Sequence, residues 1–422
     1  MDKAGDRATL YAIIVIVVGI LATTLGQPDL LAMIPIRNLL KNELHVGRAA
    51  NAAFFFWSGL AWYFKPVAGI ITDAFPILGS RRKSYLLISS SLAALAWIAL
   101  CFTPHTYGAL LWIVIVINTF MVITSTVVGA YLVETAQTIA GSGRLTAIRE
   151  VVMQSCRIIN GPASGFLASV AFGWTAGVSG GIVFLLVPVT IFFLHERRES
   201  VSSAGVLDAA ATQLKRIGTA RTLWAAAGLM ALFYLAPGFR TAVFYKQQND
   251  LHMTTQAQGN LQVFYGVAGV AAALAYGWAC RRLNLRSLLI ICLANATAAT
   301  LGYLFYSSVG NARFITFFEG WGFTLAELAL MDLAVRATPR GSEGLGYGLM
   351  ISVRNLALFG TDWLGSVMLD HYHIKFSMLV WANAATTLIT VPLVLLLPAA
   401  LTRAKDAQVY GRDAAPRDQM QT

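Results

Sequence analysis

Twelve apolar stretches, separated by shorter polar segments, run along the chain between residues 9 and 398. Most of them reach the ~20 residues that an α-helix needs to cross the hydrocarbon core of a bilayer. The pattern therefore predicts an all-α membrane protein with 12 transmembrane helices. The predicted spans are residues 9–38, 47–72, 84–103, 108–138, 144–170, 174–194, 221–246, 256–280, 286–308, 312–337, 342–369 and 374–398.

The composition supports this prediction. Hydrophobic residues make up 57% of the 422 residues and charged residues only 12%, which is about half the charged fraction of an ordinary soluble domain. So few charges could not cover the surface of a soluble protein of this length. Soluble enzymes and soluble binding domains are therefore excluded, and an integral, multi-pass membrane protein is expected.

The basic residues predict the orientation. The chain has 31 Lys and Arg against 20 Asp and Glu, a formal net charge of +11. Most of the basic residues fall in the predicted loops of one face, and cytoplasmic loops carry such an excess. Because an even number of spans puts both ends of the chain on one side, we expect both termini in the cytoplasm and a plasma (inner) membrane location. No zinc spacing or aromatic–basic groove indicates a nucleic acid partner.

The longest internal loop divides the predicted spans into two sets of six. This division predicts an N-terminal six-helix bundle at 1–194, a cytoplasmic central loop at 195–220, a C-terminal six-helix bundle at 221–398 and a cytoplasmic tail at 399–422. The two sets also resemble each other, since Ser155-Cys156-Arg157 in helix five matches Ser352-Val353-Arg354 in helix eleven. Two such bundles, related by a pseudo-two-fold axis, form the major facilitator fold, which works by rocking one half against the other.

The loop after the second span contains Gly69-x3-Asp73 and then Gly79-x-Arg81-Arg82, similar to the loop signature of the major facilitator superfamily. The longer segment KPVAGIITDAFPILGSRRKSYL (65–86) resembles the folate–biopterin transporter family. LLKNELHVG (39–47), PGFRTAVFYKQQNDL (237–251) and ATPRGSEGLGYGLMISVRN (337–355) resemble further segments of that family. Helix four of the family has a D-x-x-x-D pattern, which residues 126–130 lack. The resemblance implies a major facilitator transporter for folates or pterins.

Residues at the inner ends of the spans are predicted to gate the site. Asp73 of the loop signature would latch onto the neighbouring helix in one conformation, together with Arg81 and Arg82. Lys65 precedes a proline at the inner end of helix two, and Glu134 is the only acid on helix four. For Lys65, the sequence leaves open a position at the interface or a pair with Asp73.

Arginines at bilayer depth indicate the binding site, because a charge there is costly unless it faces a cavity or a partner. Arg157 and Arg354 occupy matching positions in helices five and eleven. Gln154 shares the polar stripe of Arg157, and Asn355 follows Arg354. A planar guanidinium matches a carboxylate in a bidentate way, so the two arginines predict an anion clamp. The alternative is that each is locked to a nearby acid and only holds helices together.

Asp29 and Arg240 are each preceded by a proline that can interrupt a helix. Asp29 follows Gln27-Pro28, where the broken backbone can face a cavity. We predict that it binds substrate or takes a proton, with an ion pair near the outer mouth as the alternative. Arg240 follows Pro237-Gly238 and is predicted to guide substrate or to form a salt bridge in a gate.

The remaining candidates are Gln262 and Glu327. Gln262 lies on a polar face of helix eight that suits hydrogen bonding to substrate. Glu327 lies mid-helix in the tenth span without an obvious partner on its own helix, and is the first candidate for a proton site. The alternative is that it pairs with Arg354 or Arg157.

Motifs of other classes are missing from the sequence. It has no Walker loop for ATP, no metal-ligand cluster and no catalytic constellation, so we predict a non-enzyme without cofactor or metal. The prediction is a monomeric secondary active transporter that moves a small organic anion by alternating access, coupled to protons. The alternatives are a muropeptide- or drug-type permease of the same fold, and a non-transporting membrane sensor or lipid-binding protein.

Overall fold

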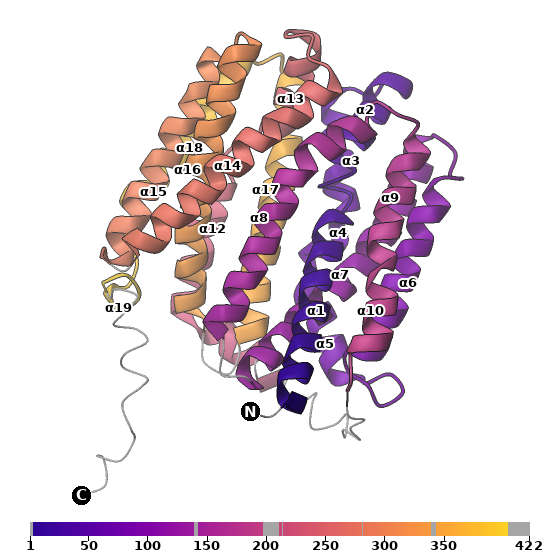
Figure 1. Cartoon of the computed structure of the whole chain (residues 1–422). Coiled ribbons are helices and arrows are strands. Elements are labelled where there is room, and N and C mark those ends of the chain that lie inside the picture. The colour runs from indigo at the N-terminus through magenta and orange to yellow at the C-terminus, as the bar shows by residue number, and fades with distance from the viewer. Residues whose placement is uncertain are drawn as a thin grey trace, which may run out of the picture.

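The computed structural model describes residues 3–138, 142–196, 211–212, 214–280, 282–338 and 343–403. Within these ranges, the side chains of three residues named above, Asp73, Glu134 and Gln154, lie outside the described set. The described chain is helical apart from its turns and one isolated bridge between Ile77 and Ser80. It forms a single upright bundle of long helices (Figure 1).

The N-terminal segment, residues 3–196, contributes ten α-helices. They are α1 (Lys3–Leu25), α2 (Met33–Asn38), α3 (Arg48–Ser58), α4 (Leu60–Tyr63), α5 (Lys65–Ala74), α6 (Lys83–Leu100), α7 (Tyr107–Thr138), α8 (Ser142–Leu167), α9 (Phe172–Phe184) and α10 (Leu186–Phe193), with a π-helical turn, η1 (Leu39–Glu43), after α2. α6 packs between α7 and α9, and α1 packs against α7, α8 and α10.

The C-terminal segment, residues 214–403, follows. It comprises α12 (Arg221–Tyr234), α13 (Arg240–Asn249), α14 (Thr255–Ala279), α15 (Leu285–Leu301), η2 (Gly302–Phe305), α16 (Val309–Ala337), α17 (Glu343–Asp370), α18 (Phe376–Leu393), η3 (Val394–Leu396) and α19 (Ala399–Thr402). α16 packs on α14 and α15, and α18 covers α15. The short α19 lies inside the range predicted as a tail, and its Leu401 is buried against the core.

Each segment has its own apolar core. Trp97, Phe54 and Met121 are fully buried in the N-terminal segment. The largest cluster of the C-terminal segment runs from Ile217 to Leu401 and includes Leu289 and Leu330. Ile217 belongs to a stretch predicted as loop, but residues 214–219 are helical and hold this side chain against the core.

Three of the interrupted spans have a break at which a side chain from a neighbouring helix donates to a backbone carbonyl. After α1 ends ahead of Pro28, the indole of Trp97 donates to the carbonyl oxygen of Gly26 at 3.0 Å. The amide of Asn118 donates to Ser58 O (2.7 Å) at the junction of α3 and α4, and that of Asn383 donates to Pro237 O (2.9 Å) between α12 and α13. In a bilayer, irregular backbone is tolerated only with such partners, so the breaks are built features.

Seven helical stretches of the described chain are long and apolar enough to cross a membrane: Lys83–Leu100, Tyr107–Leu132, Phe172–Phe193, Thr255–Ala279, Leu285–Phe305, Val309–Ala334 and Phe376–Leu396. The other predicted spans are interrupted, as at α3–α5 and α12–α13, or carry internal charges, as α8 and α17 do. Two of these polar spans make contacts across the two segments, since α8 packs on the apolar α14 and α17 packs on α3, α4 and α5.

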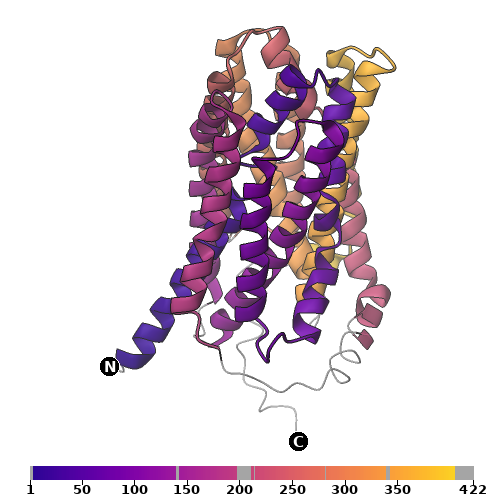
Figure 2. The ribbon, with the colours of Figure 1, turned by 90° about the vertical axis from the view of Figure 1, so that its right-hand side faces the viewer.

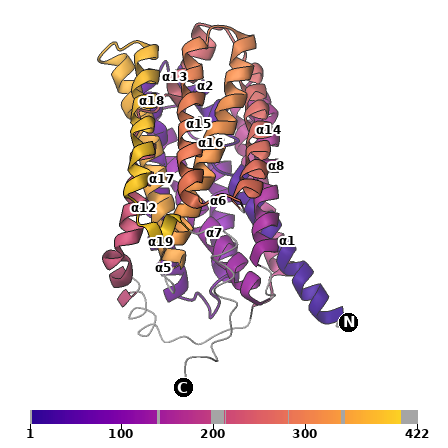
Figure 3. The ribbon, with the colours of Figure 1, turned by 90° about the vertical axis from the view of Figure 1, so that its left-hand side faces the viewer.

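The bundle has two different ends. The first turns of α1 and the short α19 lie at one end, which we call the terminal face, whereas α2 and α13 lie at the opposite end, the distal face (Figure 1). The same arrangement is visible from both sides (Figure 2 and Figure 3). The two described ends of the chain therefore lie on the same side of the bundle.

Candidate functional site

Several charged side chains lie at one level inside the bundle. Arg157 is ten residues from the distal end of α8, Glu319 is ten residues from the distal end of α16, and Arg240 is the first residue of α13. Ten helical residues correspond to ~15 Å, so these charges lie about midway through a bilayer-sized bundle. Asp29 lies in the turn between α1 and α2. We call Asp29, Arg157, Arg240 and Glu319, with Tyr265 of α14, the central layer.

The predicted clamp residue Arg354 already has a partner. Its Nη2 lies 2.7 Å from Glu327 Oε1, and the two side chains are 16% and 21% exposed. The guanidinium also donates to the hydroxyl of Tyr234 (3.3 Å) and to Asn355 Oδ1 (3.0 Å). The pairing of Arg354 with Glu327 is the alternative that the sequence left open for both residues.

Arg157 and Arg240 differ from Arg354. Neither makes a hydrogen bond or ion pair in the described part of the chain, and Arg240 is exposed. Arg157 is within electrostatic reach of Tyr234 and Tyr265, and Arg240 of Asp29 and Glu319. Two uncompensated guanidinium groups at this depth are expensive without an anion, and their forked donors suit a carboxylate or phosphate.

Gln262 lies beside Arg157, where α8 and α14 cross. A Cβ atom on Gly161, one turn from Arg157, would lie 3.1 Å from the Cβ of Gln262. Gln262 and Tyr265 are both partly buried, three residues apart on α14, so they share a face of that helix. They provide amide and hydroxyl groups next to the unpaired guanidinium.

Asp29 borders a small cavity between the N-terminal segment and Phe359 of α17. The cavity has a volume of about 10 Å³, which is room for about one water molecule. It is lined by Pro28, Asp29, Phe55, Ser58, Gly59, Trp62, Asn118 and Phe359. Asp29 Oδ1 is buried and lacks a hydrogen-bond partner in the described chain, so this carboxylate also needs a water, a proton or a ligand.

The predicted gating residues lie toward the terminal face. Lys65 donates to the hydroxyl of Ser125 at 3.1 Å and lies over the ring of Trp62 at 5.3 Å. Arg81 and Arg82 belong to the turn before α6, and their backbone N–H groups donate to Glu196. The side chains of Asp73 and Glu134 lie outside the described residues.

Glu196 is a residue that the sequence analysis missed. Its carboxylate accepts hydrogen bonds from the hydroxyl of Ser80 and from the backbone N–H groups of Arg81 (2.9 Å), Arg82 (3.1 Å) and Lys83 (2.9 Å). Burial alone would raise the pKa of this carboxyl, but these hydrogen bonds outweigh burial and hold its pKa below the ordinary value. Glu196 therefore ties the end of α10 to the first turn of α6. Its negative charge at the N-terminus of α6 also interacts favourably with the helix dipole.

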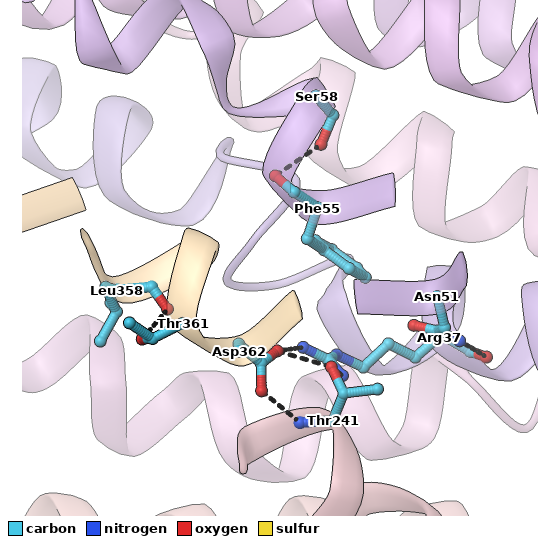
Figure 4. A network of polar contacts seen from close by, with 8 residues as sticks. All are labelled: Arg37, Asn51, Phe55, Ser58, Thr241, Leu358, Thr361 and Asp362. Atoms are coloured by element: carbon cyan, nitrogen blue, oxygen red, sulfur yellow. Dashed lines mark hydrogen bonds and ion pairs between the residues drawn. The ribbon is translucent and has the colours of Figure 1, made fainter. Parts of the chain in front are cut away.

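A buried ion pair joins the two segments just distal to the central layer, where Thr241 directly follows Arg240. Arg37 of α2 and Asp362 of α17 approach to 3.5 Å, with only 5% and 3% of their side chains exposed. Thr241 of α13 donates to Asp362 through its backbone N–H (2.9 Å) and its hydroxyl (2.6 Å), and accepts a bond from Arg37 (Figure 4). The ring of Phe55 packs under the guanidinium at 4.7 Å. We call Arg37, Thr241 and Asp362 the distal lock.

A second set of contacts surrounds the lock. Arg48 of α3 binds Asp370 of α17 at 2.7 Å, where the side chains are 36% and 25% exposed. Lys41 donates to Gln248 Oε1 (2.8 Å) and Asn249 Oδ1 (2.6 Å) of α13. Because all these bonds run between the two segments, the structure is closed at the distal face.

Glycines allow α8 and α14 to approach closely near the same face. A Cβ atom on Gly161 would lie 2.6 Å from the carbonyl oxygen of Gly259, and one on Gly259 would come closer still to the oxygen of Gly161. A Cβ on Gly165 would lie 2.8 Å from the oxygen of Thr255. Since the atoms that such a Cβ would meet are backbone oxygens, they cannot move aside without separating the two helices.

Comparison with known proteins shows which family the chain resembles. Residues 26–414 match the model of the BT1 family. The chain is 25% identical over 412 residues to a folate-biopterin transporter of Synechocystis, covering 89% of this chain and 80% of that one. It is 23% identical over 358 residues to folate transporter 1 of Plasmodium falciparum, covering 81% and 70%.

Solved structures show the same fold at low identity. The chain matches a D-xylose-proton symporter with a TM-score of 0.69 and 13% identity, over 93% of this chain and 98% of that one. A variant of the nucleoside transporter NupG matches with a TM-score of 0.66 and 13% identity, over 92% and 99%. Both are transporters, and the likeness confirms the overall fold that the sequence predicts. The chain belongs to the BT1 family and is a membrane transporter.

Proposed function

We propose that this transporter moves a small organic anion by alternating access between two six-helix bundles, residues 1–194 and 221–398, that together make 12 spans. The observation that carries the proposal is a pair of guanidinium groups, Arg157 and Arg240, which come from opposite segments at the same depth and have no hydrogen-bond or ion-pair partner among the described residues. An anion that bridges them would draw the two bundles together. Opening one face while closing the other around a fixed central site is how such folds transport.

Each residue of the site has a role in this proposal. Arg157 and Arg240 bind the anionic group of the substrate, and Gln262 with Gln154 donates or accepts hydrogen bonds beside them. Arg354, with Asn355, joins the site when its pair with Glu327 opens in another conformation. Loss of a charge-assisted hydrogen bond costs roughly 1.5–3 kcal/mol, so two arginines can supply most of the affinity for a small solute.

The substrate class is proposed from the relatives. Curated relatives are named folate and folate-biopterin transporters, and a folate has both a carboxylate and a flat heteroaromatic ring. Tyr234 and Tyr265 lie within electrostatic reach of Arg157 and would stack such a ring while the arginines hold the carboxylate. We therefore propose a folate- or pterin-like anion.

Proton coupling and gating belong to the same proposal. Asp29 and Glu327 are the carboxyls that the sequence nominates for the proton. Opening at the terminal face would be controlled by Lys65, Asp73, Arg81, Arg82 and Glu134, just as the distal lock would control opening at the distal face. We place the terminal face, with both termini, in the cytoplasm of a plasma (inner) membrane because most basic loops lie there. Reporter fusions at Thr422 and in the 195–220 loop should both report the inside.

A binding screen tests the proposal. Purified protein would be heated with folate, biopterin, nucleosides, muropeptides and neutral sugars, because a ligand of the folded state raises the unfolding temperature. We expect folate or biopterin to stabilise the parent. Arg157→Lys and Arg240→Lys should weaken that binding roughly 10- to 150-fold although the charge is kept, since the forked donor is lost.

The matched control is Arg48→Lys, because Arg48 lies in the second set of distal contacts. It should leave the affinity unchanged. Parent-like affinity in both well-folded central variants would contradict the anion site. If only a muropeptide or a nucleoside stabilised the protein, that ligand would replace folates and pterins as the proposed substrate class. Binding of a ligand without its transport would favour a membrane sensor.

A further inference from the structure

Glu319 is a carboxyl of the central layer that the site described so far does not use. It lies on α16, is partly buried, and accepts a hydrogen bond from the hydroxyl of Tyr303 in η2. The Tyr303 ring packs edge-on against Phe239 at 4.9 Å and stacks on Tyr306 at 5.2 Å. The hydroxyl is therefore held toward Glu319 by a packed aromatic cluster.

The charged groups around Glu319 come from several elements. Arg240 of α13 is the nearby cation, because Phe239, which directly precedes it, packs against Tyr303, the hydrogen-bond donor to Glu319. Arg240 forms no ion pair in the described chain. The other titratable neighbours are Tyr265 of α14 and Tyr306 after η2. Arg240 also acts on Asp29 of the N-terminal segment. One exposed guanidinium thus lies within electrostatic reach of carboxylates of both segments without binding either in the described chain.

We propose that Glu319 takes up the proton that travels with the substrate, and that Arg240 couples the two. When the anion binds Arg240, its negative charge cancels the field of the guanidinium at Glu319. A proton from the water that reaches the site then bonds to the Glu319 carboxylate, and the neutral acid keeps its hydrogen bond with Tyr303. When the anion leaves, Arg240 again faces the carboxyl and the proton returns to water.

This inference rests on the proposed function and assigns its coupling carboxyl. Glu327 on the same helix is less suited, because Arg354 lies 2.7 Å away and already compensates its charge. A proton on Glu327 would leave a buried guanidinium without a counter-charge, which is costly. A proton on Glu319 leaves no guanidinium without a counter-charge, since Arg240 then binds the anionic substrate.

The first test needs no substrate. Arg240→Gln removes the guanidinium charge, as a bound anion would cancel it, so Glu319 should hold its proton at neutral pH. Infrared difference spectra across a pH titration would show a protonated-carboxyl band in Arg240→Gln. We expect this band to disappear in Arg240→Gln/Glu319→Gln and to shift in Arg240→Gln/Tyr303→Phe, which removes the hydrogen bond.

The matched control is Asp332→Asn in the Arg240→Gln background. Asp332 is another acid of α16, paired with Arg336 at 2.8 Å and bonded to Tyr276. The band should persist in this variant. A band that survives Glu319→Gln, or that vanishes only with Glu327→Gln or Asp29→Asn, would overturn the assignment.

The second test uses transport in proteoliposomes with labelled folate as the probe. Glu319→Gln mimics the protonated acid, so it should lose accumulation driven by a pH gradient and keep counterflow exchange. Accumulation equal to that of the parent would contradict the proposal. If folate is not transported by the parent at all, the substrate class fails, whereas the infrared result still decides the role of Glu319.

Discussion

Replacing Asp362 with Asn removes the negative charge of the distal lock while keeping its shape. In the distal-closed structure, Arg37 is 5% exposed and Asp362 is its ion-pair partner. Breaking a buried pair by removing one charge costs ~3–5 kcal/mol, and we take the lower end because the carbonyl oxygen of Asn still accepts a hydrogen bond. When the distal face opens, Arg37 departs with the N-terminal segment and water can solvate it. The penalty therefore falls on the closed state.

A penalty of ~3 kcal/mol shifts the equilibrium between closed and open distal faces by roughly 150-fold toward the open one. The shift can be measured by electron paramagnetic resonance, as the distance between spin labels at Asn42 and Asp250. Both residues are exposed and lie at the distal ends of η1 and α13. The four native cysteines would first be replaced. Asp362→Asn should add or enlarge a long-distance population.

The second distal pair gives a matched control. Asp370 also lies on α17 and also binds an arginine of the N-terminal segment, but Arg48 is 36% exposed and Asp370 25%. An exposed pair contributes only ~0–1 kcal/mol, so Asp370→Asn should change the distances little. Removing both charges, in Arg37→Gln/Asp362→Asn, should restore the closed population in part. Identical distance distributions for Asp362→Asn and the parent would refute the role of the lock.

Three further predictions follow from other parts of the structure. Gly259→Ala should hinder distal closure and slow transport, since its Cβ would strike the backbone of α8. Gly277→Ala on the same helix meets no atom within 4 Å and should be tolerated. Transport at the parental rate in both variants would contradict the close α8–α14 contact. Glu196→Gln should lower the free energy of unfolding by ~1 kcal/mol near neutral pH. Because the pKa of Glu196 in the folded protein is depressed below 4.5, the parent should lose this extra stability as pH falls below about 4.5. Thermal unfolding across pH measures this, with the exposed Glu43→Gln as control, and an equal pH dependence in parent and Glu196→Gln would exclude the role of Glu196. Asp73→Asn should slow transport while folate affinity changes little, and loss of binding by a folded variant would show that Asp73 belongs to the substrate site instead.

The sequence predicts the helices well because apolar length and prolines act locally. The predicted break at Pro28 is present as the turn between α1 and α2. The positions of costly charges are also visible in the sequence, which is why Arg157 and Arg240 were found. The predicted count of 12 spans stays a prediction, because seven stretches meet the length and apolarity of a span.

The partners of those charges could not be predicted from the sequence. Arg37 and Asp362 are 325 residues apart, and their pairing depends on how two separately folded segments dock. Arg37 falls at the end of the predicted span 9–38, and Asp362 is one polar position on α17. Glu196 was hidden for the same reason, since its carboxylate caps a helix that begins 113 residues earlier. Arg354 and Glu327 show the intermediate case, in which the pairing was one of two open alternatives.

The central claim is that the chain couples the movement of a proton to that of an organic anion bound by Arg157 and Arg240. The most direct measurement is the accumulation of labelled folate in proteoliposomes with an imposed pH gradient, in the parent and in Arg157→Gln/Arg240→Gln. The account predicts that the parent accumulates folate above the external concentration and that the double variant does not take it up. Uptake by the double variant at the parental rate, or a parent that only equilibrates folate whatever the pH gradient, would contradict it.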